Sequence, residues 1–108
     1  MRGSFYAYAF HDALESIMSH DIRHLSTAHR FETTVDGFTC ELDYQLQDRI
    51  MTITHTGVPD EVGGRGIAGE LVRAAFETAR SEGWKVVPAC SYARIWVERH
   101  PEYAALRA

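Results

Sequence analysis

Val62-Gly63-Gly64-Arg65-Gly66-Ile67-Ala68 is the stretch that decides the fold, because it places three glycines between an expected strand and an expected helix. Glycine lets the backbone turn tightly and lets its N–H groups approach a ligand closely. The start of a helix adds unpaired N–H groups and the positive end of the helix dipole. The stretch therefore indicates a loop that binds a phosphate group, and a glycine-rich turn without a ligand is the alternative.

The segment after this loop has the apolar spacing of an amphipathic helix. From Gly66, apolar residues recur three and four positions apart, at Ile67, Ala68, Leu71, Val72, Ala75, Phe76 and Ala79. Gly83 is expected to end this helix, because glycine readily adopts the left-handed conformation that follows a last helical turn. Residues 84–88 then form a short apolar run typical of a strand. Together with the strand expected over residues 49–56, the pattern predicts a strand, glycine loop, helix and strand in succession.

Upstream of the loop, the pattern predicts an antiparallel meander of three strands. Phe31, Thr33 and Val35 alternate with other residues, and Asp36-Gly37 is a favoured two-residue hairpin turn. The next strand is expected to place Phe38, Cys40, Leu42, Tyr44 and Leu46 on one face. Val58-Pro59 is expected to end the third strand, because proline cannot donate a hydrogen bond to a neighbouring strand.

Length and charge limit the classes of function. A chain of 108 residues forms a single domain, and a net charge of -4 argues against non-specific binding of nucleic acid. Residues 1–50 hold four arginines against eight acids, so the excess of acid lies away from the glycine loop. No apolar run reaches the length of a membrane span, and no segment resembles a signal peptide. We therefore expect a cytoplasmic protein without a membrane partner.

Cysteines and histidines give little support for a disulfide or a metal site. Cys40 and Cys90 do not form a C-x-x-C pair, and Cys40 is expected in the core. His20, His24 and His29 lack a ligand partner at a recognised spacing, so no metal is expected. Residues 1–17 are interpreted as an N-terminal extension or leader, which leaves residues 18–108 as the domain.

Two other phosphate-binding folds are excluded. Gly64-Arg65-Gly66-Ile67-Ala68-Gly69 matches the letters of the dinucleotide fingerprint G-x-G-x-x-G, but no acidic residue ends the strand over residues 84–88. The chain also has no room for a second mononucleotide-binding half. A Walker loop requires Lys followed by Ser or Thr after the glycines, which is absent.

Four motifs in order resemble the short, single-domain Gcn5-related N-acetyltransferases (GNATs). They are His55-Thr56-x-Val58-Pro59, the glycine loop from Gly63 to Ala68, Val86-Val87-Pro88-Ala89-Cys90-Ser91-Tyr92, and Arg99-His100-Pro101-Glu102-Tyr103. The resemblance extends over residues 31–106. It implies a mixed α/β (α+β) fold, with a mostly antiparallel sheet, a central helix after the glycine loop and a short C-terminal helix. The superfamily signature is Gln/Arg-x-x-Gly-x-Gly/Ala. Gly66 and Ala68 match its last two positions, whereas Gly63 stands at the first.

The resemblance implies acetyl-CoA as the cofactor. Backbone N–H groups of Gly63, Gly64, Arg65, Gly66, Ile67 and Ala68 are expected to bind the pyrophosphate. The strand edge around Thr56 and Val58 is expected to bind the pantetheine arm, in a gap where this strand and residues 84–89 splay apart. Cys90 and Ser91 are expected to line the same site. Arg65 is expected to supply the positive charge that Gly63 does not.

Three residues are candidates for the chemistry. Cys90 precedes an expected helix, whose N-terminus favours a thiolate that would attack the thioester, and a packing thiol is the alternative. His55 is a candidate base for an incoming amine, and a hydrogen-bonded strand histidine is the alternative. Tyr92 is a candidate donor to the departing CoA thiolate. His100-Pro101 is expected to break the preceding helix and fold the tail back, and Trp84 and Trp96 are expected in the core.

The sequence thus predicts an N-acetyltransferase that moves an acetyl group from acetyl-CoA to an amine on a small molecule or a protein. A non-catalytic module that binds CoA or acyl-CoA is the main alternative. An interaction domain that retains only the fold is the third. Neither the acceptor nor the oligomeric state follows from the residues.

Overall fold

A computed structural model describes residues 20–108 of the chain. The extension expected over residues 1–17 lies outside the described residues. The described part holds five strands in the order β1-β2-β3-β4-β5. Their bounds are β1 Arg23–Leu25, β2 Arg30–Val35, β3 Phe38–Gln47, β4 Ile50–Gly57 and β5 Lys85–Pro88. Strands β1 to β4 are antiparallel neighbours, and only β4 and β5 run parallel. The mixed, mostly antiparallel sheet agrees with the predicted fold class.

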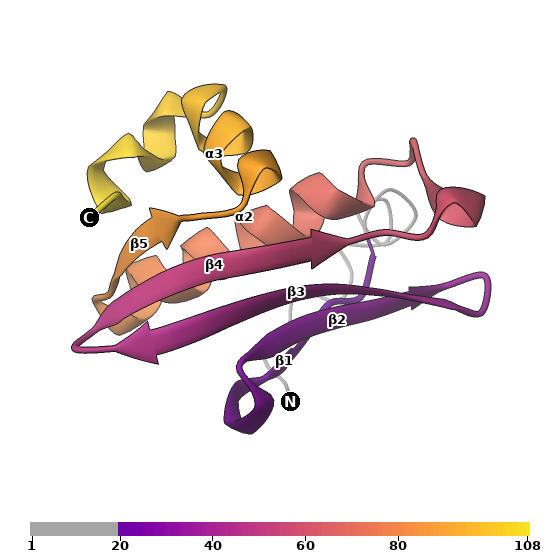
Figure 1. Cartoon of the computed structure of the whole chain (residues 1–108), viewed down its shortest axis with the longest axis horizontal. Helices are drawn as coiled ribbons and strands as arrows, with labels where there is room; N and C mark the ends of the chain where they lie inside the picture. The colour runs from indigo at the N-terminus through magenta and orange to yellow at the C-terminus, as the bar shows by residue number, and fades with distance from the viewer. Residues whose placement is uncertain (1–19) are drawn as a thin grey trace, which may run out of the picture.

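Helices cover one face of this sheet. Helix α2 (Ile67–Glu82) connects β4 to β5, and α3 (Ser91–Glu98) follows β5. Figure 1 shows α2 behind the strands, whereas no helix of the described part lies over the face turned toward the viewer. We call the face toward α2 the inner face and the opposite one the open face. The core lies between α2 and the inner side chains of the strands, including Phe31, Cys40, Leu42, Met51, Ile53, Leu71 and Phe76, all at most 1% exposed.

The predicted helix after the glycine loop is confirmed. Its buried side chains are Ile67, Leu71, Val72, Ala75, Phe76 and Ala79, at the spacing of three and four that the sequence indicates. Gly83 ends it in the left-handed conformation, with φ of 77°, and donates its N–H to the last turn. A β-carbon there would lie 2.8 Å from Arg49 Nη2, so only glycine fits without a shift.

Several element boundaries differ from the prediction. The third predicted strand runs over Ile50–Gly57 rather than residues 49–56, because Asp48 and Arg49 form the turn with positive φ. Strand β5 begins at Lys85 rather than at position 84. Strand β1 was not predicted: its three residues are all exposed and carry no alternating pattern. Phe38 is 36% exposed instead of buried, because it directly follows the hairpin turn at the end of the sheet.

The C-terminal tail folds back on α2, as His100-Pro101 predicts. A 3-10 helix, η4 (Pro101–Leu106), begins at this proline. Its Tyr103 is 3% exposed, accepts a hydrogen bond from Arg73 and donates one to Glu77, both on α2. Trp96 is 6% exposed and stacks on His100, while Trp84 is only partly buried against the core. The tail thereby fixes α3 beside α2.

Candidate functional site

The glycine loop forms a row of backbone N–H groups at the start of α2. After the short 3-10 helix η3 (Asp60–Val62), Gly64 and Gly66 have φ of 76° and 80°, in the left-handed region that favours glycine. Gly66 is the N-cap of α2 and offers no side chain to the first turn. Within the described part of the chain, no N–H of residues 64–69 donates a hydrogen bond to a protein acceptor. Such a row of donors with the helix dipole behind it fits an anionic group.

Two charged side chains beside this loop, Arg65 and Glu70, are paired with other residues. Arg65 Nη1 donates to Asp36 Oδ2 at 2.8 Å, at the tip of the β2–β3 hairpin, and both side chains are exposed. Glu70 lies in the first turn of α2, where its carboxylate accepts from the His20 backbone N–H at 2.7 Å and lies 2.8 Å from His20 Nδ1. Among the described residues, this loop therefore offers an anion the hydrogen bonds of its backbone N–H groups rather than an unpaired basic side chain.

Strands β4 and β5 part at Pro88, where the family resemblance implies a gap, but on β4 the separation begins after Ile53 rather than near Val58. Their pairing ends at Ile53 opposite Pro88, although β4 continues to Gly57. The carbonyl of Ile53 accepts the N–H groups of Ala89 and Cys90, both at 3.0 Å, and the chain then turns into α3. Residues 54–57 thus have β3 on one side and no strand on the other among the described residues. This free edge can bind a peptide-like chain.

A β-bulge at the end of β4 decides which way the site residues face. The register shifts between Asp43 and Tyr44 of β3, so that Tyr44 pairs with Ile53 and Asp43 pairs with His55. Thr54 is therefore the extra residue. Because paired residues share a face, His55 lies on the open face with Asp43. Thr56 pairs with the buried Leu42 and lies on the inner face.

Cys90 and Thr56 meet on this inner face. Cys90 is the N-cap of α3, as expected, and its Sγ accepts the N–H of Ala93 at 3.4 Å. The hydroxyl of Thr56 lies 3.5 Å from the same sulfur. Cys90 is half-buried, the neighbouring Ser91 is exposed, and Val58 is partly buried against the core. These expected cofactor contacts surround the gap between β4 and the start of α3.

Tyr92 points from α3 toward the first turn of α2. A β-carbon added to Gly69 would lie 3.4 Å from the Tyr92 hydroxyl and 3.4 Å from Trp96 Nε1. Tyr92 is 42% exposed, yet partial burial raises the pKa of its phenol above the ordinary value. The hydroxyl therefore keeps its proton at neutral pH, as a proton donor must.

His55 lies apart from Cys90 and Tyr92, on the open face. Its Nε2 is 3.2 Å from Glu41 Oε2, and its side chain is 54% exposed. The structure thus brings Cys90 and Thr56 together on the inner side of the gap, directs Tyr92 toward Gly69 of α2, and places His55 on the other side of the strand. Glu41 was not predicted as part of the site, because no sequence signal gives the register that brings it to His55.

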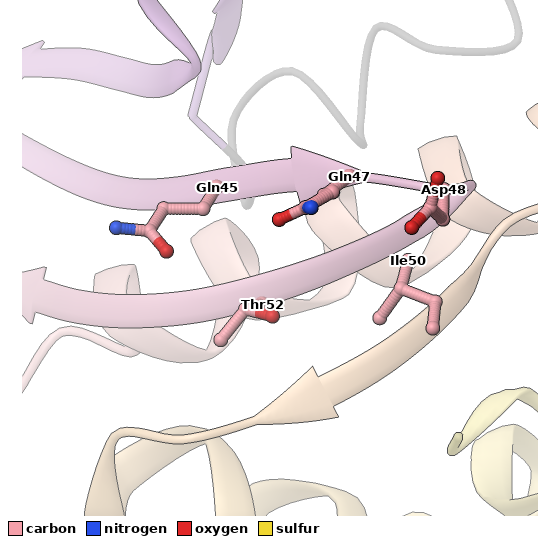
Figure 2. Close-up of a pocket in the computed structure, with 5 residues that line it drawn as sticks. All are labelled: Gln45, Gln47, Asp48, Ile50 and Thr52. Carbon is pink, nitrogen blue, oxygen red and sulfur yellow. The ribbon is translucent and has the colours of Figure 1, made fainter.

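Other features of the described residues point to no second site of this kind. One surface hollow of about 240 Å³ is lined by Gln45, Gln47, Asp48, Ile50 and Thr52 (Figure 2), and another of about 360 Å³ is lined by His20, Asp21, Arg23, Thr33 and Thr34. The His, Cys, Asp and Glu side chains of residues 20–108 form no group of three that could hold a metal ion. None of the described helices is long and apolar enough to cross a membrane.

Comparisons with known proteins agree on one family. A family model described as GCN5-related N-acetyl-transferase matches residues 30–106. Protein NATD1 of Homo sapiens is 40% identical over 53 residues, which cover 49% of this chain and 47% of the relative. The chain thus spans about half the length of this relative and of its Gallus gallus and Mus musculus counterparts. Protein NATD1 of Xenopus tropicalis is 28% identical over 98 residues, which cover 88% and 90% of the two chains.

A solved structure supports the same grouping. The NMR solution structure of a GCN5-like protein from Staphylococcus aureus superposes with a TM-score of 0.66 at 28% identity. The match covers 82% of this chain and 87% of the other.

Proposed function

Because the chain belongs to the GCN5-related N-acetyltransferase family, we propose that it transfers the acetyl group of acetyl-CoA to an amine acceptor. The single observation that carries the proposal is the row of N–H groups over residues 64–69, which have no acceptor among the described residues, beside the edge of β4 that has no strand partner there. The row fits the charge of a pyrophosphate, and the free edge fits the two amides of a pantetheine arm. Acetyl-CoA supplies an activated thioester as the acetyl donor.

The residues around the gap have separate roles in this proposal. Backbone N–H groups from Gly64 to Ala68 bind the pyrophosphate, with Arg65 at the rim, whereas the N–H of Gly63, which the sequence analysis included, already donates to the Asp60 carbonyl at 3.0 Å. Thr56 and Val58 bind the pantetheine arm, and Cys90 and Ser91 line the thioester end. Cys90 contacts the Thr56 hydroxyl and the N–H of Ala93, and neither group is a base. Because neither contact can take the proton of the Cys90 thiol, we favour direct attack of the amine on the thioester over an acetyl-cysteine intermediate.

The proton balance assigns roles to two side chains. An ammonium acceptor gives one proton to His55, and the resulting amine attacks the carbonyl carbon, so that a C–N bond forms and the C–S bond breaks. The Tyr92 hydroxyl donates a proton to the departing CoA thiolate, and it recovers a proton from the acceptor nitrogen, which loses its second proton in this step. The proton on His55 then leaves to solvent, because the imidazole is exposed.

Two measurements on the full chain test the proposal. The first is thermal unfolding with and without acetyl-CoA, because a ligand at about 100 times its Kd adds about 2.7 kcal/mol and raises Tm by several degrees. The second is chromatographic detection of released CoA with n-butylamine, spermidine and a lysine-rich peptide as acceptors. A Tm rise with turnover supports the proposal. A Tm rise without turnover favours a non-catalytic CoA-binding module, and no Tm rise contradicts both.

A further inference from the structure

The hydrogen bond between His55 and Glu41 fixes which nitrogen of the imidazole is free. A carboxylate only accepts hydrogen bonds, so the 3.2 Å contact requires that His55 Nε2 carries the proton and donates it to Glu41 Oε2. In the neutral ring, Nδ1 then holds the lone pair. A base needs such a lone pair, held in a fixed direction.

Gly57 provides the space in which this contact forms. Gly57 is the cross-strand partner of Glu41. A β-carbon at position 57 would lie 2.6 Å from Glu41 Oε2 and 2.9 Å from His55 Nε2, the two atoms that bond to each other. Any other side chain at this position would displace them.

Neighbouring charges leave Glu41 available for this role. Asp43 pairs with His55 across the strands, but its carboxylate is held by Arg30 at 2.7 Å and 3.2 Å. Glu32, on the same open face, is bound by Arg23 and Arg30. Within the described residues, His55 is the only side-chain hydrogen-bond partner of Glu41.

We propose that Glu41 is a positioning residue, which holds His55 through Nε2 so that Nδ1 faces an acceptor on the open face of the sheet. Gly57 is required because it leaves room for the pair. This inference rests on the proposed acetyl transfer. It adds a residue whose effect on the reaction passes entirely through His55.

A double-mutant cycle separates this role from a structural one. Glu41→Gln is expected to lower kcat about tenfold and to leave the KM for acetyl-CoA unchanged. This loss is smaller than the loss of about 100-fold or more expected when a general base itself is removed, because Glu41 acts only through His55. In a His55→Gln background, the same change is expected to lower kcat less than about twofold, because the group that Glu41 positions is gone. Gly57→Ala is expected to reproduce Glu41→Gln. Glu32→Gln is the matched control, since it removes a carboxylate of the open face that does not touch His55.

Nitrogen-15 NMR of the imidazole rings in the free protein supplies a readout that does not depend on turnover. We expect neutral His55 to carry its proton on Nε2, with a signal that shifts in Glu41→Gln and not in Glu32→Gln. A proton on Nδ1 would overturn the inference, as would an equal loss of kcat in both His55 backgrounds or no loss in either. If the wild-type protein released no CoA with any amine, the proposed function would fail as well. Wild-type turnover that Glu41→Gln leaves unchanged would remove the positioning role alone.

Discussion

Placing a carboxylate at Ala68 should weaken acetyl-CoA binding without harming the fold. Ala68 is half-buried in the first turn of α2, and helical side chains tilt toward the helix N-terminus. The new charge in Ala68→Glu would therefore lie beside the free N–H groups of residues 64–69. A carboxylate about 6 Å from a pyrophosphate of about two negative charges, at an effective dielectric constant near 60, costs about 1.8 kcal/mol. This corresponds to roughly a 20-fold increase in Kd.

Calorimetric titration with acetyl-CoA at low salt measures this effect, and Ala68→Gln is the control of nearly equal size without charge. The neutral variant should bind within about threefold of wild type, because only side-chain volume changes. Thermal stability of Ala68→Glu should not fall, since a negative charge in the first turn interacts favourably with the helix dipole. Raising the salt concentration should reduce the difference between the two variants through screening. Equal Kd values for wild type and Ala68→Glu would refute the placement of the pyrophosphate at this loop.

Three further outcomes are expected. Cys90→Ser retains an acceptor for the α3 cap and should keep kcat within about twofold of wild type, and mass spectrometry of the wild-type protein should find no acetyl group on Cys90. A large loss of kcat in the variant together with an acetyl adduct on wild-type Cys90 would establish the covalent route. Burial and the hydrogen bond to Glu77 raise the pKa of Tyr103 above the value in the unfolded chain. Protonated Tyr103 therefore stabilises the fold fully below about pH 10, and this stabilisation is lost as the pH rises through the pKa of the folded state. Tyr103→Phe should lower the free energy of unfolding by about 1–2 kcal/mol at pH 7 and remove this alkaline dependence, as urea titrations at several pH values would reveal. Gly83→Ala should cost about 1–2 kcal/mol in the same assay, because position 83 combines a positive φ with a β-carbon 2.8 Å from Arg49 Nη2; unchanged stability would contradict this reasoning.

Local sequence patterns predicted the elements whose causes lie within a few neighbouring residues. The apolar spacing from Ile67 to Ala79 reports the buried side of α2 directly, because one helix face meets the core along its whole length. The helix end at Gly83 and the Asp36-Gly37 turn could also be predicted from the sequence, since both have positive φ values that few residues tolerate. Cys90 at the start of α3 followed from the strand before it and the helix after it.

Features that depend on pairing between strands could not be predicted from local sequence patterns. Strand β1 has three exposed residues, and its extended form follows from pairing with β2 rather than from its own pattern. The contact between Glu41 and His55, which are 14 positions apart, depends on a strand register that the residues between them do not encode locally. The family resemblance alone predicted the edge of β4 that we propose for the cofactor, whereas the direction of each side chain on it depends on the bulge.

That bulge also bears on the mechanism. In a regular strand, alternation from the buried Ile53 would place His55 on the inner face toward Cys90, and a thiol and imidazole pair would be the natural interpretation. The extra residue at Thr54 reverses this order, so that the Thr56 hydroxyl meets Cys90 and His55 turns to the open face. A base on the open face can serve an acceptor that arrives from that side, but it cannot activate a sulfur on the other. The register of a single strand pair therefore favours direct transfer, in which donor and acceptor meet across the end of β4.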